Sequence, residues 1–146
     1  MRYWDTSALV ALVVQQLWSE RAHQYHRSDR DVVTSWLSSI ECSSALWRLL
    51  RLGELGPEEF AITQATLAAL RDTLDELALA EGVRDIALRL VTEHPLRAAD
   101  ALHLASALQW CGEAPEGHEF VTFDRRLAEA ARREGFVVLT EGEGTG

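Results

Sequence analysis

Short segments rich in β-branched and aromatic residues alternate along this chain with longer segments of helical character, and this alternation limits the folds open to it. Short segments of this kind are typical of buried strands. The chain contains them at Arg2–Asp5, Asp31–Ser35, Leu77–Ala80, Phe120–Thr122 and Phe136–Leu139. Strands that alternate with helices predict a layered α/β fold around a mostly parallel sheet.

The helical segments have recognisable beginnings and ends. Thr6 and Ser7 provide hydroxyl caps for an apolar helix after the first strand, and Ser35 or Ser38 does so for a helix that runs to about Leu52. The remaining helices are predicted at Leu17–Arg27, after Gly56-Pro57, and at Val83–Glu93, Ala98–Trp110 and Arg125–Glu134.

The chain has the length of one compact domain. Its 146 residues contain neither an internal repeat nor a linker, so residues 1–140 are predicted to form a single domain. The Glu/Gly-rich residues 141–146 are expected to be a disordered tail. No apolar run approaches the ~20 residues that span a bilayer. The apolar stretch 8–14 follows Asp5 and precedes no signal-cleavage site. We therefore expect a cytoplasmic protein without a membrane segment.

The charge of the chain excludes several functions. The formal net charge is -9, and every basic residue apart from histidine is arginine. An acidic chain is a poor general nucleic-acid binder because phosphate neutralisation supplies most non-specific affinity. This counts less against an enzyme that contacts one phosphate through a metal ion. The lack of lysine excludes a P-loop and argues against phosphoacceptor and haloacid-dehalogenase-like domains, which place a lysine beside the phosphoryl group.

Four acidic residues fall where an open parallel sheet presents its ligand crevice, at strand ends and nearby helix starts. Asp5 and Asp124 follow strands, whereas Glu41 and Asp100 lie near the beginnings of helices. Carboxylates ~4 Å apart repel by about 4 kcal/mol at an effective dielectric of 20, so converging acids need a counter-charge. Oxygen ligands suit Mg²⁺ or Mn²⁺, which predicts metal-assisted phosphodiester hydrolysis. The alternative is that each acid is an ordinary helix cap, since the chain has 23 acidic residues.

The segments around these acids resemble the PIN-domain nucleases, especially the VapC-type toxins of bacterial toxin–antitoxin pairs. The matching segments are 3–9, 39–41, 96–105 and 121–127, in the order and at the spacing of that family. The resemblance implies a three-layer α/β/α sandwich and endonucleolytic cleavage of RNA. It also implies that Mg²⁺ or Mn²⁺ is held by Asp5, Glu41, Asp100 and Asp124.

The resemblance also implies supporting residues and partners. Thr6 and Thr122 occupy hydroxyl positions that support the carboxylates or a bound water; alternatively, Thr6 only caps a helix and Thr122 is an ordinary strand residue. The expected partners are an RNA substrate, a second copy of the chain in a homodimer, and a protein antitoxin that covers the acidic groove. A non-catalytic interaction module with the same fold and a nuclease that acts on DNA remain as alternatives.

Other side chains near the motifs have weaker signals. The candidates for binding substrate phosphates are arginines, namely Arg97 and Arg48, followed by Arg51, Arg125 and Arg126. Salt bridges to the many acids are the alternative interpretation for all of them. His103 lies one helical turn beyond Asp100, and a packing or surface role is favoured over proton transfer. The five tryptophans are expected to fill the core or a dimer interface.

Overall fold

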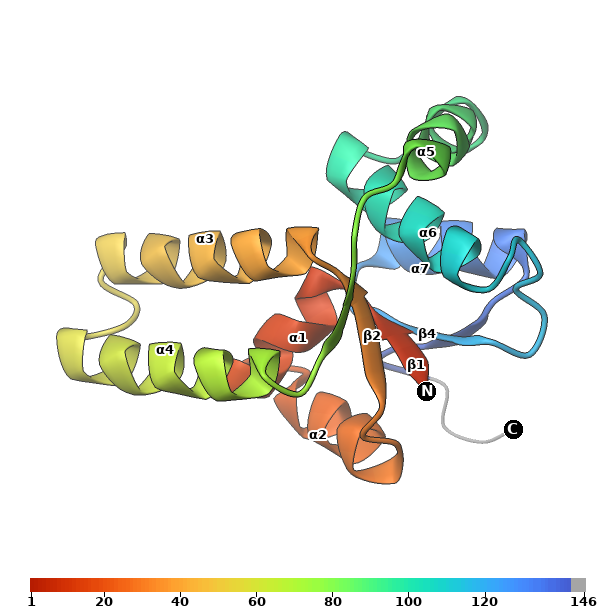
Figure 1. Cartoon of the computed structure of the whole chain (residues 1–146). Helices are drawn as coiled ribbons and strands as arrows, with labels where there is room; N and C mark the ends of the chain where they lie inside the picture. The colour runs from red at the N-terminus through yellow and green to blue at the C-terminus, as the bar shows by residue number, and fades with distance from the viewer. Residues whose placement is uncertain (143–146) are drawn as a thin grey trace.

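A computed structural model describes residues 1–142 and shows a five-stranded sheet between two layers of helices (Figure 1). The strands are β1 (Arg2–Trp4), β2 (Val32–Ser35), β3 (Asp75–Leu77), β4 (Glu119–Val121) and β5 (Val137–Leu139). They lie in the order β3-β2-β1-β4-β5, and every pairing among the described strands is parallel. The α/β sandwich around a mostly parallel sheet is therefore confirmed.

The helices follow the strands in the alternating pattern that the sequence indicates. They are α1 (Thr6–Val13), α2 (Ser19–Ser28), α3 (Leu37–Arg51), α4 (Pro57–Arg71), α5 (Glu81–Glu93), α6 (Ala98–Trp110) and α7 (Arg125–Glu134). Helices α3 and α4 run side by side and project from one side of the sheet (Figure 1). Helices α5, α6 and α7 lie together on the opposite side (Figure 1).

Alternation along the strands builds a separate core on each face of the sheet. Tyr3 and Phe120 are fully buried on the face covered by α5, α6 and α7. Trp4 and Val121, the next residues along the same two strands, are fully buried on the opposite face with α1 and α3. Because β1 is the central strand and is packed on both faces, the residue that follows it is held rigidly at the edge of the sheet.

Some local predictions were wrong. The third strand is Asp75–Leu77 rather than Leu77–Ala80. It is an edge strand with two exposed acidic residues, and charged edge strands lack the apolar signal of a buried one. The cap of α1 is Asp5, whose Oδ1 accepts the N–H of Ala8 at 3.0 Å. The two hydroxyl residues predicted to cap this helix are instead its first residues.

The C-terminal segment is described as far as Gly142. Glu141 pairs with Arg125 at 3.4 Å, and the remainder of the predicted tail, residues 143–146, lies outside the described residues. The division into a domain and a tail stays a prediction. Among residues 1–142, none of the helices has the length and apolar character required to span a membrane.

Candidate active site

The four acids singled out in the sequence line one hollow of about 420 Å³, to which Asp5, Glu41, Asp100 and Asp124 all contribute. A neighbouring hollow of about 470 Å³ shares the last three of them. These three carboxylates therefore lie where the two hollows meet. The convergence expected from the positions of the acids is present in the structure.

The fold brings the acids together because each lies near the start of a helix at the carboxyl edge of the sheet. Asp5 and Asp124 end the connections after β1 and β4 and cap α1 and α7. Asp100 lies in the first turn of α6, and Glu41 lies near the start of α3. Helix N-termini carry partial positive charge and stabilise nearby carboxylates. The site therefore gathers negative charge without a lysine.

Asp5 is held in a cradle of hydrogen-bond donors and is only 4% exposed. Its Oδ1 accepts from Ser7 Oγ at 2.7 Å and its Oδ2 accepts from Thr122 Oγ1 at 2.7 Å. Burial raises the pKa of Asp5 above its ordinary value, against the opposing effects of His103 and these hydrogen bonds. Positive charge nearby would therefore favour the ionised form of this carboxylate.

Glu41 is held through one of its two carboxylate oxygens. Thr6 Oγ1 donates to Oε1 at 2.8 Å, and His103 Nε2 lies 2.6 Å from the same oxygen. Burial alone would raise the pKa of Glu41, but the hydrogen bonds from His103 and Thr6 outweigh it and the pKa lies below its usual value. Glu41 is thus held in its ionised form.

Asp100 is in a less favourable environment. Burial, and then the charge of Asp124, raise the pKa of Asp100, while a hydrogen bond from the backbone of Arg97 opposes them. The repulsion between these two acids is the electrostatic reason why the hollow favours a cation.

The oxygen-rich donor set suits a hard divalent cation. Within residues 1–142, however, no three of these acids bring carboxylate oxygens within 4.8 Å of one another. A cation that keeps part of its water shell, as Mg²⁺ does, fits this spacing because water completes the contacts that the carboxylates do not make. A fully protein-coordinated ion does not fit it.

Sequence reasoning undervalued three residues around the acids. Ser7 and Tyr3 were not considered as site residues, and His103 was assigned to packing or the surface. His103 is buried, at 2% exposure, and contacts the site through Nε2, while its Nδ1 lies 3.0 Å from the Tyr3 hydroxyl. The available signals were the spacing of three residues between Asp100 and His103 and the hydroxyl two residues after Asp5.

The arginines lie around the acids rather than neutralising them. Arg48 lines the first hollow, and the second is lined by Arg97, Arg125 and Arg126. Of these, only Arg125 forms an ion pair among the described residues, with Glu141. Arg51, at the end of α3, also lacks an ion pair there and lines neither hollow. Within residues 1–142, the salt-bridge interpretation therefore applies to Arg125 alone among these five arginines.

Tryptophans occur both in the core and on the surface. Trp4 is fully buried, whereas Trp36 and Trp47 on or beside α3 are 40% and 42% exposed. Trp18 stacks against Phe123, with ring centroids 6.3 Å apart and planes 17° apart. Both side chains line the first hollow, the one to which all four acids contribute and which we call the acidic hollow. One wall of the hollow is thus aromatic.

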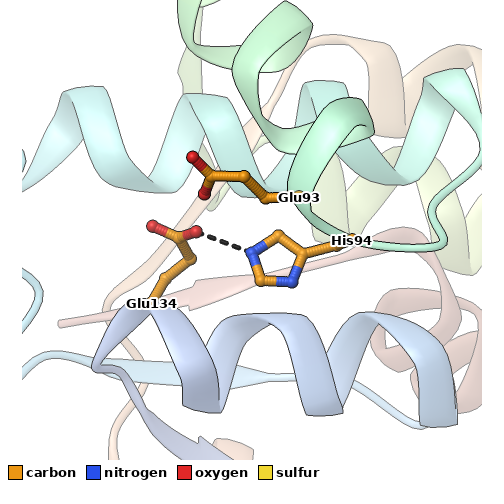
Figure 2. Close-up of side chains that lie close together, drawn as sticks. All are labelled: Glu93, His94 and Glu134. Atoms are coloured by element: carbon orange, nitrogen blue, oxygen red, sulfur yellow. Dashed lines mark hydrogen bonds and ion pairs between the residues drawn. The ribbon is translucent and has the colours of Figure 1, made fainter.

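A second group with metal-ligating side chains lies at the far end of α7, where Glu93, His94 and Glu134 approach one another (Figure 2). His94 Nε2 is 2.7 Å from Glu134 Oε1. The guanidinium of Arg89 donates to Glu93 at 2.7 Å and to both oxygens of Glu134 at 3.1 and 3.0 Å. Because Arg89 already provides the counter-charge, we interpret this group as a structural ion-pair network.

Comparisons with known sequences agree with these features. A family model for the PIN domain matches residues 2–133. Ribonuclease VapC47 of Mycobacterium tuberculosis is 34% identical, over 97% of this chain and 98% of that protein. Ribonuclease VapC3 of Pyrobaculum aerophilum is 30% identical, over 86% of this chain and 90% of that protein.

Solved structures share the fold. A crystal structure of a Pyrobaculum aerophilum protein has a TM-score of 0.68 and 22% identity, and the match covers 95% of this chain and 90% of that one. A chain in a toxin–antitoxin complex from Klebsiella pneumoniae has a TM-score of 0.61 and 17% identity, with 88% and 91% covered. This chain therefore belongs to the PIN domain family, and it is similar along nearly its whole length to ribonucleases of the VapC kind.

Proposed function

We propose that this protein is a divalent-metal-dependent endoribonuclease that acts as the toxin of a toxin–antitoxin pair. The observation that carries the proposal is the convergence of Asp5, Glu41, Asp100 and Asp124 on one hollow. Membership of the PIN domain family and similarity to proteins named ribonuclease support it.

The four carboxylates are proposed to hold Mg²⁺ or Mn²⁺. When bound, such a cation supplies Lewis acidity toward water and toward the scissile phosphate. The chain itself orients the carboxylates: Ser7 and Thr122 fix both oxygens of Asp5, while Thr6 and His103 fix one oxygen of Glu41. Such fixed side chains keep their orientation during the reaction and so reduce the cost of reorganisation.

Arginines at the rim provide the attraction for RNA that the net charge of -9 does not. Arg48 and Arg97 lie on the two hollows and form no ion pair within residues 1–142. A guanidinium binds phosphate oxygens through two parallel hydrogen bonds, so each is suited to hold the phosphates that flank the cut. Binding is thus local to the site rather than spread over the surface.

The partner proposed for this toxin is a protein antitoxin. The chain of like fold in the Klebsiella pneumoniae structure comes from a toxin–antitoxin complex, which supports this partner. A segment that covers the acidic hollow would exclude RNA, because all four carboxylates line that hollow. The homodimer expected from the family resemblance stays a prediction.

The proposal is tested with a labelled RNA pool and DNA of the same sequences, each incubated with the protein and Mg²⁺, Mn²⁺ or EDTA. We expect internal cuts in RNA that require the metal. Cleavage of DNA at a rate comparable to that of RNA would contradict the proposed ribonuclease and favour the alternative, a nuclease that acts on DNA. No cleavage, together with no rise in melting temperature at millimolar Mn²⁺, would favour the non-catalytic module.

A further inference from the structure

We infer that His103 is a positioning residue, which together with Tyr3 fixes the carboxylate of Glu41 so that one oxygen is bound within the protein and the other is presented to the cation. The inference deepens the proposed function and rests on it for the presence of a cation. It concerns a histidine that lines the same hollow as the four acids and lies in the first two turns of α6.

The imidazole of His103 is fixed from both ends. Nδ1 lies 3.0 Å from the hydroxyl of Tyr3 on β1, and Nε2 lies 2.6 Å from Glu41 Oε1 on α3. The rings of Tyr3 and His103 also pack edge to face, with centroids 6.2 Å apart at 72°. Both side chains are buried, at 0% and 2% exposure. The ring therefore connects the central strand to the helix that carries Glu41.

The direction of the hydrogen bonds follows from the chemistry of the groups. An ionised carboxylate only accepts, so at 2.6 Å the proton of this bond is on His103 Nε2. At Nδ1, the Tyr3 hydroxyl donates when the imidazole is neutral and accepts when it is protonated, so the contact forms in either case. Thr6 donates its single hydroxyl hydrogen to the same Glu41 oxygen and lies 3.1 Å from Nε2. His103 and Thr6 thus both direct a donor at Oε1 of Glu41, and the Tyr3 hydroxyl holds the imidazole from its other side.

Both bonds to Glu41 end on Oε1, and Oε2 has no hydrogen-bond partner within residues 1–142. A free glutamate side chain would have to lose rotational freedom when it binds a cation. Holding Oε1 removes this freedom beforehand and leaves Oε2 available at the hollow. Groups that orient a metal-binding carboxylate in this way commonly change metal affinity or activity about 10- to 100-fold when they are removed.

His94 provides a matched control for this arrangement. It is also buried, at 8% exposure, and its Nε2 lies 2.7 Å from a glutamate oxygen, that of Glu134. This second pair lies at the C-terminal end of α7, whereas Asp124 caps the N-terminal end of the same helix. A substitution of His94 removes a similar buried contact but does not touch the four acids.

The test compares His103→Leu, His103→Gln, Tyr3→Phe and His94→Leu by titrating Mn²⁺ against the melting temperature of the protein without RNA. The Mn²⁺ concentration for half-maximal RNA cleavage is measured in parallel. We expect His103→Leu to raise the apparent Kd for Mn²⁺ about 10-fold. His103→Gln keeps an N–H donor and should recover most of this loss, and Tyr3→Phe should give a smaller loss. His94→Leu should lower the melting temperature and leave the Kd unchanged.

Wild-type Mn²⁺ affinity in His103→Leu would overturn the inference, and so would an equal loss in His94→Leu. If His103→Leu does not fold, His103→Gln and Tyr3→Phe decide. A near-wild-type Mn²⁺ affinity in His103→Gln, together with a weaker affinity in Tyr3→Phe, supports the inference. An unchanged Mn²⁺ affinity in Tyr3→Phe overturns it. A wild-type protein that binds Mn²⁺ but cuts no RNA would contradict the proposed function and leave this comparison valid. A wild type that does not respond to Mn²⁺ would overturn both.

Discussion

Thr122 donates its hydroxyl hydrogen to Oδ2 of Asp5 at 2.7 Å, which joins the residue after β4 to the residue after β1. Ser7 makes a second link between the same segments, because its Oγ donates to Asp5 and accepts the N–H of Phe123 at 2.9 Å. The two connections that carry Asp5 and Asp124 are thereby fixed to each other. The precision of the site thus comes from hydroxyl groups rather than from the acids themselves.

Asp100→Asn is expected to stabilise the metal-free protein and to abolish cleavage. The pKa of Asp100 is raised by burial and by Asp124, so its ionised form is less favourable in the folded protein than in the unfolded chain. Removing the charge should add about 0.5 kcal/mol, or roughly 2 °C in melting temperature. RNA cleavage should become undetectable, because Asp100 is one of the four proposed ligands of the cation. Thermal melts in EDTA and cleavage assays in Mn²⁺ check both parts; a lower melting temperature with full activity would contradict them.

Arg48→Gln is expected to raise the KM for RNA several-fold and to reduce the salt dependence of binding. Arg48 lines the acidic hollow and forms no ion pair within residues 1–142. A lost phosphate contact should lower the slope of log affinity against log salt by about 1. Arg51→Gln is the control, because this arginine is on the same helix but lines neither hollow. Equal effects of the two substitutions would show that Arg48 acts only through net charge.

Trp18→Ala is expected to weaken RNA binding through loss of stacking. Trp18 lines the hollow and stacks on Phe123, so an RNA strand bound at the hollow would pass close to its ring. Stacking of a base on an aromatic ring contributes about 1–3 kcal/mol, which corresponds to a loss of about 5- to 100-fold in affinity. Trp36→Ala serves as the control, since Trp36 is exposed but does not line the hollow. Fluorescence anisotropy with labelled RNA measures both; unchanged affinity in Trp18→Ala would exclude this contact.

Glu134→Gln is expected to destabilise the protein in a pH-dependent manner. Burial raises the pKa of Glu134, but hydrogen bonds from Arg89 and His94 outweigh it, so the pKa lies below its usual value. A carboxyl with a lowered folded-state pKa stabilises the fold above its unfolded pKa and loses this effect as the pH falls through the folded value. The substitution should therefore cost about 1 kcal/mol at pH 7.

Urea unfolding from pH 7 down to pH 3 measures this difference, which should shrink in the acidic part of the range. Glu129→Gln is the control, because the ion pair of Glu129 with Arg133 joins two exposed side chains. Exposed pairs contribute little. A penalty for Glu134→Gln that is the same at every pH would contradict the ion-pair interpretation.

Local patterns in the sequence predicted the elements whose signals are local. The bounds Ala98–Trp110 and Arg125–Glu134 are those of α6 and α7. Alanine and leucine favour helix, and Gly135, with φ 112°, ends α7 in a left-handed conformation that glycine adopts readily. The edge strand β3 was misplaced because its charged residues resemble a loop.

The site was predictable only as far as parallel topology dictates it. Acids after strands and at helix starts can face one edge of a parallel sheet, which made Asp5, Glu41, Asp100 and Asp124 candidates, and the family resemblance of their segments selected them among the 23 acidic residues. His103 was not predictable in this way, because its partners Glu41 and Tyr3 are 62 and 100 residues distant along the chain. Its role depends on how α6 packs against β1 and α3, which no local pattern records.

The most direct test of the central claim is the rate of RNA cleavage by wild-type and Asp5→Asn protein, each in Mn²⁺ and in EDTA. The substituted amide keeps an oxygen that can accept the N–H of Ala8, so the fold should persist, and circular dichroism checks this. The account predicts cleavage by the wild type in Mn²⁺ alone and none by Asp5→Asn in either condition. Cleavage by folded Asp5→Asn, or cleavage by the wild type in EDTA, would contradict a carboxylate–metal nuclease.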